Sequence, residues 1–298
     1  MERNDNIFDR NGRNDLHWTA MLYHDSKFWM FYNYGMAVMG PTPLMAGLAT
    51  SEDGEKFDII KDVVIHPDFG SWDSELIEVH SIIRADGMWR MYYCGRDEEN
   101  FRIGMAESED LIEWKKHKEP IVDIGDSHWE SVHVADPYVL RFGGKYLMFY
   151  MGKGDVWQVG MAESKDGIEW NKHIENPMIR ADQEWCDGCV TLSGAVHFGN
   201  KLLAAVHGYS LTDNKFRVKL VYSEKGYSWS PVKFATGIEP EPQDFTINPG
   251  KWCDRGLVHP EIIRIGGKLL IYYTGIRVGS PNLHRVGRVE LYENEINL

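Results

Sequence analysis

The chain has 298 residues, of which 43% are hydrophobic and 12% aromatic, and it carries a formal net charge of −13 at pH 7. This negative charge argues against nucleic acid as a partner, because phosphate backbones are bound by clustered lysine and arginine. No apolar run of about 18 residues occurs, so we expect no membrane partner. Residues 1–6 lack the apolar core of a signal peptide, and we therefore expect a cytoplasmic protein.

A sequence motif recurs along the chain. Residues 104–117 match residues 160–173 at 11 of 14 positions, and both copies contain Gly-x-Ala-x-Ser. Weaker copies begin at Gly47 and Leu220. The serines of the four copies, at positions 51, 108, 164 and 223, are separated by 57, 56 and 59 residues. Such a fixed interval is typical of repeat architectures.

A hairpin pattern recurs in step with this motif. Each copy is a strand, a two-residue turn of Asp, Ser, Gly or Asn that tolerates positive φ, and a second strand. In four of the five copies a tryptophan lies 15 residues before the second turn residue. The predicted hairpins span residues 20–32, 81–93, 138–150, 194–206 and 261–273.

Each unit therefore holds two hairpin strands, a third strand ending in Gly-x-Ala-x-Ser, and a short fourth strand. Four antiparallel strands repeated radially predict an all-β fold, a five-bladed β-propeller, which we expect to form a single domain over residues 1–298. The fifth unit has only a partial third strand at residues 285–291. We expect the N-terminal segment to complete this blade and close the ring.

The first strand of each blade is expected to line the central channel. Positions eight and nine residues before the second turn residue then meet at one mouth of the channel, with Asp15 and Glu261 close by. Ionisable side chains that converge in this way predict a pocket. The polar and aromatic residues at these positions are His17, Trp18, Glu78, Asp136, Thr191 and His259.

Four cysteines are present, and two of them, Cys186 and Cys189, have CxxC spacing. A zinc site would need a second pair or histidines at matching spacing, and a redox motif would need a βαβ unit. Neither pattern occurs, so we interpret the cysteines as reduced, partly buried thiols.

The third unit carries Asp-Pro-x-Val-x-x-x-x-Gly-Lys-Tyr-x-x-Phe-Tyr over residues 136–150. With the five-fold repeat, this resembles the five-bladed propellers of glycoside hydrolase families 43 and 32, and more distantly those of family 130. The resemblance implies three axial carboxylates, with Asp15 as base and Asp136 orienting the sugar. The fourth-blade general acid of these families has no match, because Thr191 stands there, with Asp187 upstream.

The resemblance also bears on ligands. His259 matches a fifth-blade histidine that in family 43 often holds a central cation or water, so it is our metal candidate. A divalent cation such as calcium is then an option, although no cofactor is required. His207-Gly208 is similar to the phosphate-binding His-Gly of family 130 phosphorylases. The Glu-Asp-Pro-Arg signature of that family is missing, and only Glu78 stands in its place.

The leading hypothesis is a glycoside hydrolase that acts on a small glycoside or oligosaccharide. Such chemistry needs one protonated carboxyl and one carboxylate, and crowding separates their pKa values. The candidate catalytic residues are Asp136, Asp15, Glu78 and Asp187, with Asp15 as base and Glu78 or Asp187 as acid. The candidate residues for binding the carbohydrate are His17, Trp18, His80, His207 and Glu261.

Two other functions remain open at this point. A phosphorylase would hold phosphate with His207 and Lys219 and would need a single carboxyl as acid. A non-catalytic carbohydrate-binding propeller would explain the absent fourth-blade glutamate.

Overall fold

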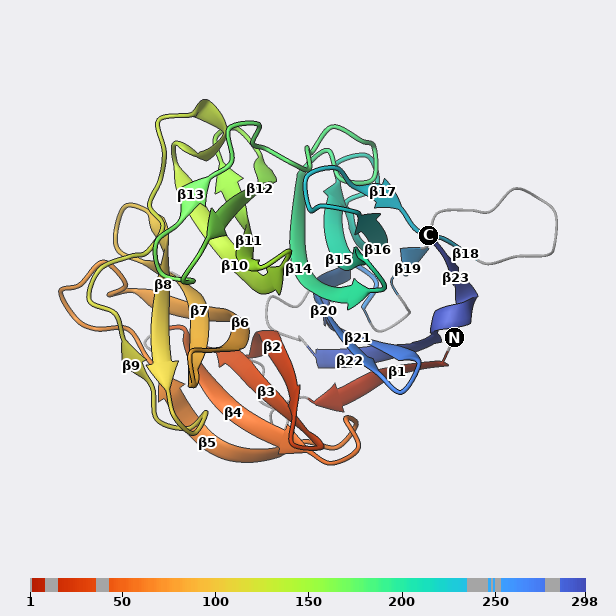
Figure 1. The fold of residues 1–298 in the computed structure, drawn as a ribbon, viewed down its shortest axis with the longest axis horizontal. Coiled ribbons are helices and arrows are strands. Elements are labelled where there is room, and N and C mark those ends of the chain that lie inside the picture. Colours follow the sequence, from red (N-terminus) through yellow and green to blue (C-terminus); the bar gives the residue numbers. More distant parts are fainter. Residues whose placement is uncertain are drawn as a thin grey trace.

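The computed structural model describes residues 2–8, 16–35, 43–234, 246–247, 249, 253–276 and 285–298. These residues form antiparallel sheets arranged radially around one axis (Figure 1). Their helical segments are two short 3-10 turns, η1 (His128–Glu130) and η2 (Glu293–Glu295). The predicted all-β, five-bladed propeller is confirmed.

Each blade begins at the axis and proceeds outward. Blade 1 contains β2 (Leu16–His24), β3 (Lys27–Tyr34), β4 (Met45–Ser51) and β5 (Asp58–Ile65). Blade 2 contains β6 (Leu76–Ala85), β7 (Met88–Arg96), β8 (Phe101–Ser108) and β9 (Lys115–Lys116). Blade 3 contains β10 (His133–Phe142), β11 (Lys145–Lys153), β12 (Trp157–Ser164) and β13 (Asn171–Lys172). Blade 4 contains β14 (Cys189–Phe198), β15 (Lys201–Ser210) and β16 (Lys215–Ser223), with β17 (Ser230–Pro231) and β19 (Thr246–Ile247) both pairing β16.

Blade 5 closes the ring with strands from both ends of the described chain. It contains β20 (Gly256–Ile265), β21 (Lys268–Ile276), β22 (Arg285–Tyr292) and, as its outer strand, β1 (Glu2–Phe8). The first strand therefore completes the last blade, as the sequence predicted. A further pair, β18 (Lys233–Phe234) and β23 (Ile296–Asn297), joins the last strand to the segment after blade 4. Figure 1 shows the two termini close together beside these strands.

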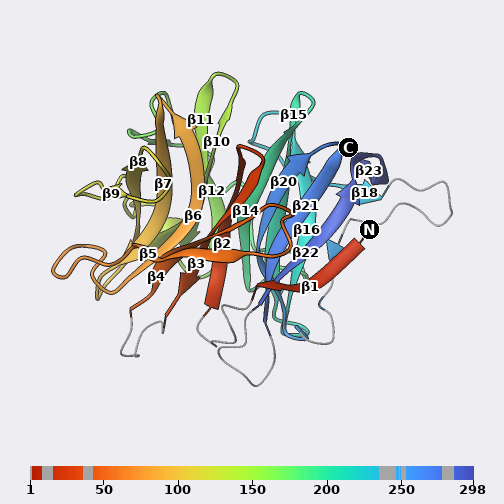
Figure 2. The ribbon, with the colours of Figure 1, turned by 90° about the horizontal axis from the view of Figure 1, so that it is seen from below.

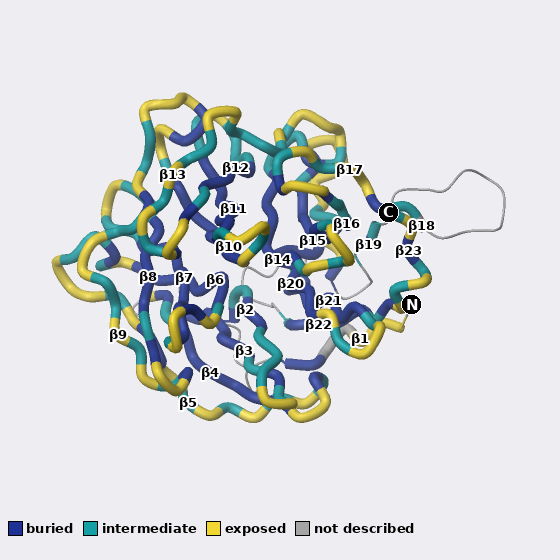
Figure 3. Tube along the Cα trace, viewed as in Figure 1, coloured by how far each residue is buried: buried dark blue, intermediate teal, exposed yellow. Residues whose placement is uncertain are grey.

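The inner strands surround the axis. β2, β6, β10, β14 and β20 each contact the next around the ring, and Figure 2 shows several of them running side by side. Buried residues lie along these strands and the second strands, whereas many exposed residues lie in turns and loops (Figure 3). In the described ranges, no helix has the length and apolar character needed to cross a membrane.

The Gly-x-Ala-x-Ser motif has a local cause in the three blades that contain it, blades 1 to 3. The serine hydroxyl accepts the backbone N–H three residues later, as Ser108 does from Leu111 at 2.9 Å, and so holds the turn after the third strand. The glycine gives space to aromatic rings. A Cβ on Gly104 would lie 2.5 Å from the Tyr93 ring and 2.7 Å from the Trp72 ring. The serine of the motif therefore stabilises a turn and its glycine permits a packing contact. These structural roles account for the motif.

Substitution of Gly104 by alanine is expected to destabilise the protein. The added methyl must displace the Tyr93 and Trp72 rings, and such overpacking costs about 1–3 kcal/mol. Denaturant unfolding monitored by tryptophan fluorescence measures the change. The control is Glu109→Ala at an exposed turn position, which should change the free energy of unfolding by less than about 0.5 kcal/mol. Equal effects of the two variants would contradict the packing role.

Candidate functional site

The inner strand of every blade carries a β-bulge or register irregularity at the same place. A bulge bends its strand and turns the bulged side chain in a new direction. The bulged residues lie next to the positions that the sequence aligns at the mouth of the channel. The register shifts fall between Leu16 and Thr19, Val79 and Ser81, Ala135 and Tyr138, Leu192 and Gly194, and Val258 and Glu261.

A bulge leaves backbone groups without partners in its own sheet, and buried backbone groups need partners. Here a side chain from an adjacent blade bonds a backbone group at or beside each bulge. The contacts are Asn33 to the Val79 carbonyl (2.9 Å), Ser81 to the Pro137 carbonyl (3.0 Å), Tyr138 to the Ala195 carbonyl (2.7 Å), the His259 amide to His207 Nδ1 (3.1 Å), and Thr274 to the His17 carbonyl (3.2 Å).

Two bulged residues have unusual backbone conformations. Asp136 has a φ of 51° and His259 a φ of 46°, and each directly precedes a proline. Positive φ in a residue other than glycine is uncommon and costs on the order of 1–3 kcal/mol, so the surrounding structure must enforce it. Such residues gather at functional sites. Asp136 and His259 face each other, with Asp136 Oδ2 3.7 Å from His259 Nδ1.

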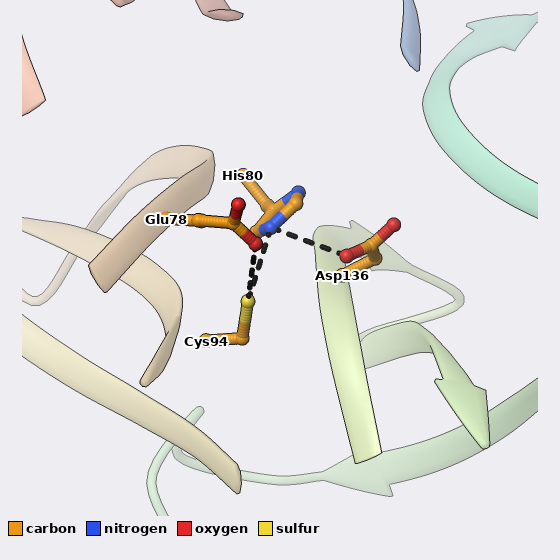
Figure 4. A group of neighbouring side chains, drawn as sticks. All are labelled: Glu78, His80, Cys94 and Asp136. Atoms are coloured by element: carbon orange, nitrogen blue, oxygen red, sulfur yellow. Dashed lines mark hydrogen bonds and ion pairs between the residues drawn. The ribbon is translucent and has the colours of Figure 1, made fainter. Parts of the chain in front are cut away.

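Four buried polar side chains gather where blades 2 and 3 meet (Figure 4). The Cys94 thiol donates to Glu78 Oε2 at 3.4 Å and lies 3.4 Å from His80 Nε2. His80 Nε2 lies 3.3 Å from Asp136 Oδ1. We call Glu78, His80, Cys94 and Asp136 the axial cluster.

Histidines and a tryptophan lie beside the axial cluster. The Trp18 and His259 rings stack with their centroids 4.2 Å apart, and the His207 ring lies 4.9 Å from that of His259. Because His207 Nδ1 accepts the His259 amide, its proton is on Nε2. The Ser193 hydroxyl, at the blade 4 bulge, is buried without a hydrogen-bond partner among the described residues.

Burial controls protonation in this region. It raises the pKa of Glu78 to about 8, with the nearby Asp136 charge acting in the same direction. Burial raises the pKa of Asp136 to about 7, against an opposing effect of the Thr191 hydroxyl. It lowers the pKa of His80 and of His207 to about 3. At neutral pH, both imidazoles are therefore neutral and Glu78 is protonated.

The structure brings most of the predicted site residues together. Glu78, His80 and Asp136 are in the axial cluster, and Trp18, His207 and His259 are adjacent to it. His17 packs edge-on against Trp18, with ring centroids 5.3 Å apart. Glu261 is buried two residues after His259 on β20. Burial raises its pKa well above the ordinary value.

Two predicted residues have their contacts elsewhere. Asp187 accepts the Leu211 amide at 2.7 Å in the connection before β14 and is outside the axial cluster. Lys219 lies over the Trp185 ring, 4.9 Å from its centroid. His259 is beside the axial cluster, which is the group that could hold a metal among the described residues, and is not a member of it. Asp15 lies outside the described residues.

Cys94 is the cluster member that the sequence did not single out. It lies on β7 directly opposite Glu78, so its side chain is on the same face of the sheet. A comparison of first-strand positions misses it because it belongs to the second strand. The spacing Glu78-x-His80 followed by Cys94 across the hairpin is the signal that would have found it.

Comparison with known proteins assigns the family. Residues 21–241 match a family model described as "Glyco_hydro_130: beta-1,4-mannooligosaccharide phosphorylase". The chain belongs to glycoside hydrolase family 130. The family is described as one of mannoside phosphorylases that also contains glycoside hydrolases. The sequence placed families 43 and 32 first and family 130 at a distance, and this ranking is corrected.

Relatives agree with the assignment. The chain is 28% identical over 164 residues to the 1,2-beta-oligomannan phosphorylase of Thermoanaerobacter sp. (strain X514), which covers 52% of this chain and 51% of that protein. It spans about half the length of the curated relatives that it matches.

Solved structures share the fold at lower identity. A structure described as a GH130 hydrolase that targets β-1,2 mannosidic linkages in Candida mannan superposes with a TM-score of 0.68 at 17% identity, over 92% of this chain and 84% of that one. A thermostable family-43 glycoside hydrolase gives a TM-score of 0.72 at 15% identity, over 95% and 92%. The similarity to family 43 is therefore one of fold.

Loss of the Ser81 hydroxyl is expected to loosen the junction that positions the axial cluster. This hydroxyl donates to the Pro137 carbonyl and accepts the Val139 amide at 3.1 Å, and both groups are buried. Ser81→Ala should lower the free energy of unfolding by about 1–3 kcal/mol, because two backbone groups lose their partner. Chemical denaturation tests this, with the exposed Ser131→Ala as control. A change no larger than that of the control would contradict the role of Ser81.

Proposed function

We propose that the protein is a phosphorylase that cleaves β-mannosidic bonds and transfers the mannosyl group to phosphate. The family model is named for such an activity, and the curated relatives from Thermoanaerobacter are named as phosphorylases of β-1,2-linked mannosides. The structural observation that carries the proposal is the buried pair Glu78 and Asp136 at the axis, in which Glu78 retains its proton at neutral pH.

Phosphorolysis uses this proton in a simple way. The bond between the anomeric carbon and the leaving oxygen breaks, Glu78 donates its proton to that oxygen, and a phosphate oxygen bonds the anomeric carbon. The proton of hydrogen phosphate then returns to Glu78. The products are mannose 1-phosphate and the shortened saccharide. Phosphate is itself the nucleophile, so one protonated carboxyl suffices and no catalytic base is needed.

Asp136 has a different place in this scheme. It lies between His80 and His259, and it carries the strained backbone of a residue held in one orientation. A carboxylate accepts hydrogen bonds from sugar hydroxyls, so Asp136 would orient the mannosyl group. The buried Ser193 hydroxyl would supply a further polar contact for the sugar.

Hydrolysis is the second candidate, and one observation favours it. Residues 78–81 read Glu-Val-His-Ser in place of Glu-Asp-Pro-Arg, so the arginine of the family signature is missing. Among the described residues, neither Glu78 nor Asp136 forms an ion pair with lysine or arginine. Phosphate is usually bound by such cations. In hydrolysis, Asp136 would activate water and Glu78 would be the acid.

Turnover of β-1,2-mannobiose and β-1,4-mannobiose, with and without inorganic phosphate, distinguishes these reactions. We expect mannose 1-phosphate to accumulate only when phosphate is present, because phosphate is the nucleophile. Anion-exchange chromatography separates it from free mannose. Release of mannose at the same rate without phosphate would contradict phosphorolysis and identify the reaction as hydrolysis. Absence of any product from both disaccharides would contradict the proposed substrate class.

Glu78→Gln should lower kcat by about 10²- to 10⁴-fold, the usual contribution of a general acid, while the fold is retained. Asp187→Asn tests the alternative acid and should leave the rate within about twofold, since an amide oxygen can still accept the Leu211 amide. The exposed Asp126→Asn is the control. Circular dichroism verifies folding. A loss in Asp187→Asn as large as that in Glu78→Gln would contradict the assignment.

A further inference from the structure

The axial cluster has the geometry of a metal site. One ligand atom from each of Glu78, His80, Cys94 and Asp136 lies within 4.8 Å of all the others. The Cys94 sulfur lies 3.4 Å from the Glu78 oxygen and 3.4 Å from the His80 nitrogen, and that nitrogen lies 3.3 Å from the Asp136 oxygen. A tetrahedral zinc ion with bonds of about 2.0–2.3 Å separates its ligand atoms by roughly 3.3–3.8 Å. The three separations agree with such a tetrahedron.

The strands explain why these side chains meet. Glu78 and His80 are two residues apart on β6, and Cys94 is the cross-strand neighbour of Glu78 on β7, so one hairpin supplies three ligands. Asp136 reaches them from the bulge of the next blade (Figure 4). The Ser81 hydroxyl bonds the backbone on the far side of that bulge and fixes the two blades together. The donor atoms are thus held by rigid strands, as a metal site requires.

The chemistry of the donors selects the metal. Calcium and magnesium bind oxygen atoms, and neither prefers a thiolate. A thiolate, an imidazole and two carboxylates suit zinc and similar transition metals. We propose that Glu78, His80, Cys94 and Asp136 bind one divalent transition-metal ion, with zinc as the best match. His259, within 3.7 Å of the second oxygen of Asp136, would orient that carboxylate.

The electrostatics of the cluster also call for a cation. Two carboxyl groups and a thiol are buried together, and the described residues offer Glu78 and Asp136 no lysine or arginine. Burial of such groups is unfavourable unless they are neutralised by protons or paired with positive charge.

The metal and the catalytic proton would compete for one carboxyl group. A metal-bound Glu78 is ionised and has no proton to donate. Zinc at this site would therefore inhibit the mannoside cleavage proposed above, and a chelator would restore it. This consequence rests on the proposed function, whereas the metal site itself does not.

The metal site is tested with the purified chain after dialysis against a chelator. Titration with Co²⁺ should produce a thiolate-to-cobalt charge-transfer band in the near ultraviolet that saturates at one ion per chain. Zn²⁺ should abolish the band by displacement. Cys94→Ala should remove the band and weaken Zn²⁺ binding by at least about tenfold, and His80→Ala should also weaken it. Circular dichroism verifies that both variants are folded.

The matched control is Cys186→Ser, which removes a buried thiol outside the axial cluster. It should retain the band. Absence of a band in the unmodified chain, or its persistence in Cys94→Ala, would overturn the proposal. Loss of the band in Cys186→Ser alone would assign the metal to the CxxC segment instead and would equally overturn it.

Activity measured in parallel separates the two proposals. Equimolar Zn²⁺ should suppress cleavage of β-mannobiose, EDTA should reverse this, and Cys94→Ala should be less sensitive to Zn²⁺. A chain that shows the cobalt band and cleaves at full rate would contradict Glu78 as the acid and leave the metal site standing. A chain that cleaves mannosides and shows no band would contradict the metal site and leave the function standing.

Discussion

The bulge in each inner strand is the constraint on which the site depends. A regular strand would alternate its side chains between the two faces of its blade, and none would be turned toward a common point. The bulge disturbs this alternation and releases backbone groups that need new partners. Side chains of adjacent blades satisfy them, as Ser81 does for the bulge beside Asp136. The same feature therefore binds the blades together and positions the residues at the axis.

The second feature is a concentration of buried acidity. Glu78 and Asp136 share a space with neutral imidazoles, and a low-dielectric site of this kind opposes ionisation of both carboxyls. The buried acidic groups of the cluster can be neutralised in two ways. A proton on Glu78 makes a general acid, and a divalent metal would accept both carboxylates with the Cys94 thiolate. The proposed catalysis and the proposed metal binding are thus alternative ways of neutralising the same charges.

The chain belongs to family 130 but differs from the signature of that family at residues 78–81. The loss of the signature arginine removes a cation from the second blade, and His80 occupies the bulge in that strand. With Cys94 opposite Glu78, the second blade offers the donors of the proposed metal site where the family signature has an arginine. This difference bears on whether the nucleophile is phosphate or water. A bound phosphate would need positively charged groups from another part of the protein.

The sequence alone determined the architecture. Turn residues, alternating strands and the Gly-x-Ala-x-Ser motif are local signals, and each recurs in step, so five blades could be counted without a structure. The incomplete fifth unit predicted closure by the N-terminal strand, because an open blade leaves unpaired backbone groups. Asp136 was singled out as the one aspartate in its column. Glu78 was a catalytic candidate together with Asp15 and Asp187, and His80 was a candidate for binding the carbohydrate.

Only the tertiary structure decided how these residues combine. Cys94 lies on a second strand, and its distance from Asp136 depends on the packing of two blades, which no local pattern records. Asp187 is close to Thr191 in sequence, yet it accepts the Leu211 amide outside the cluster, since a connection can turn away from the strand that follows it. The strained φ of Asp136 and the protonation of Glu78 depend on burial by several blades at once. Repetition in the sequence specifies the blades, but the chemistry at the axis arises from contacts between them.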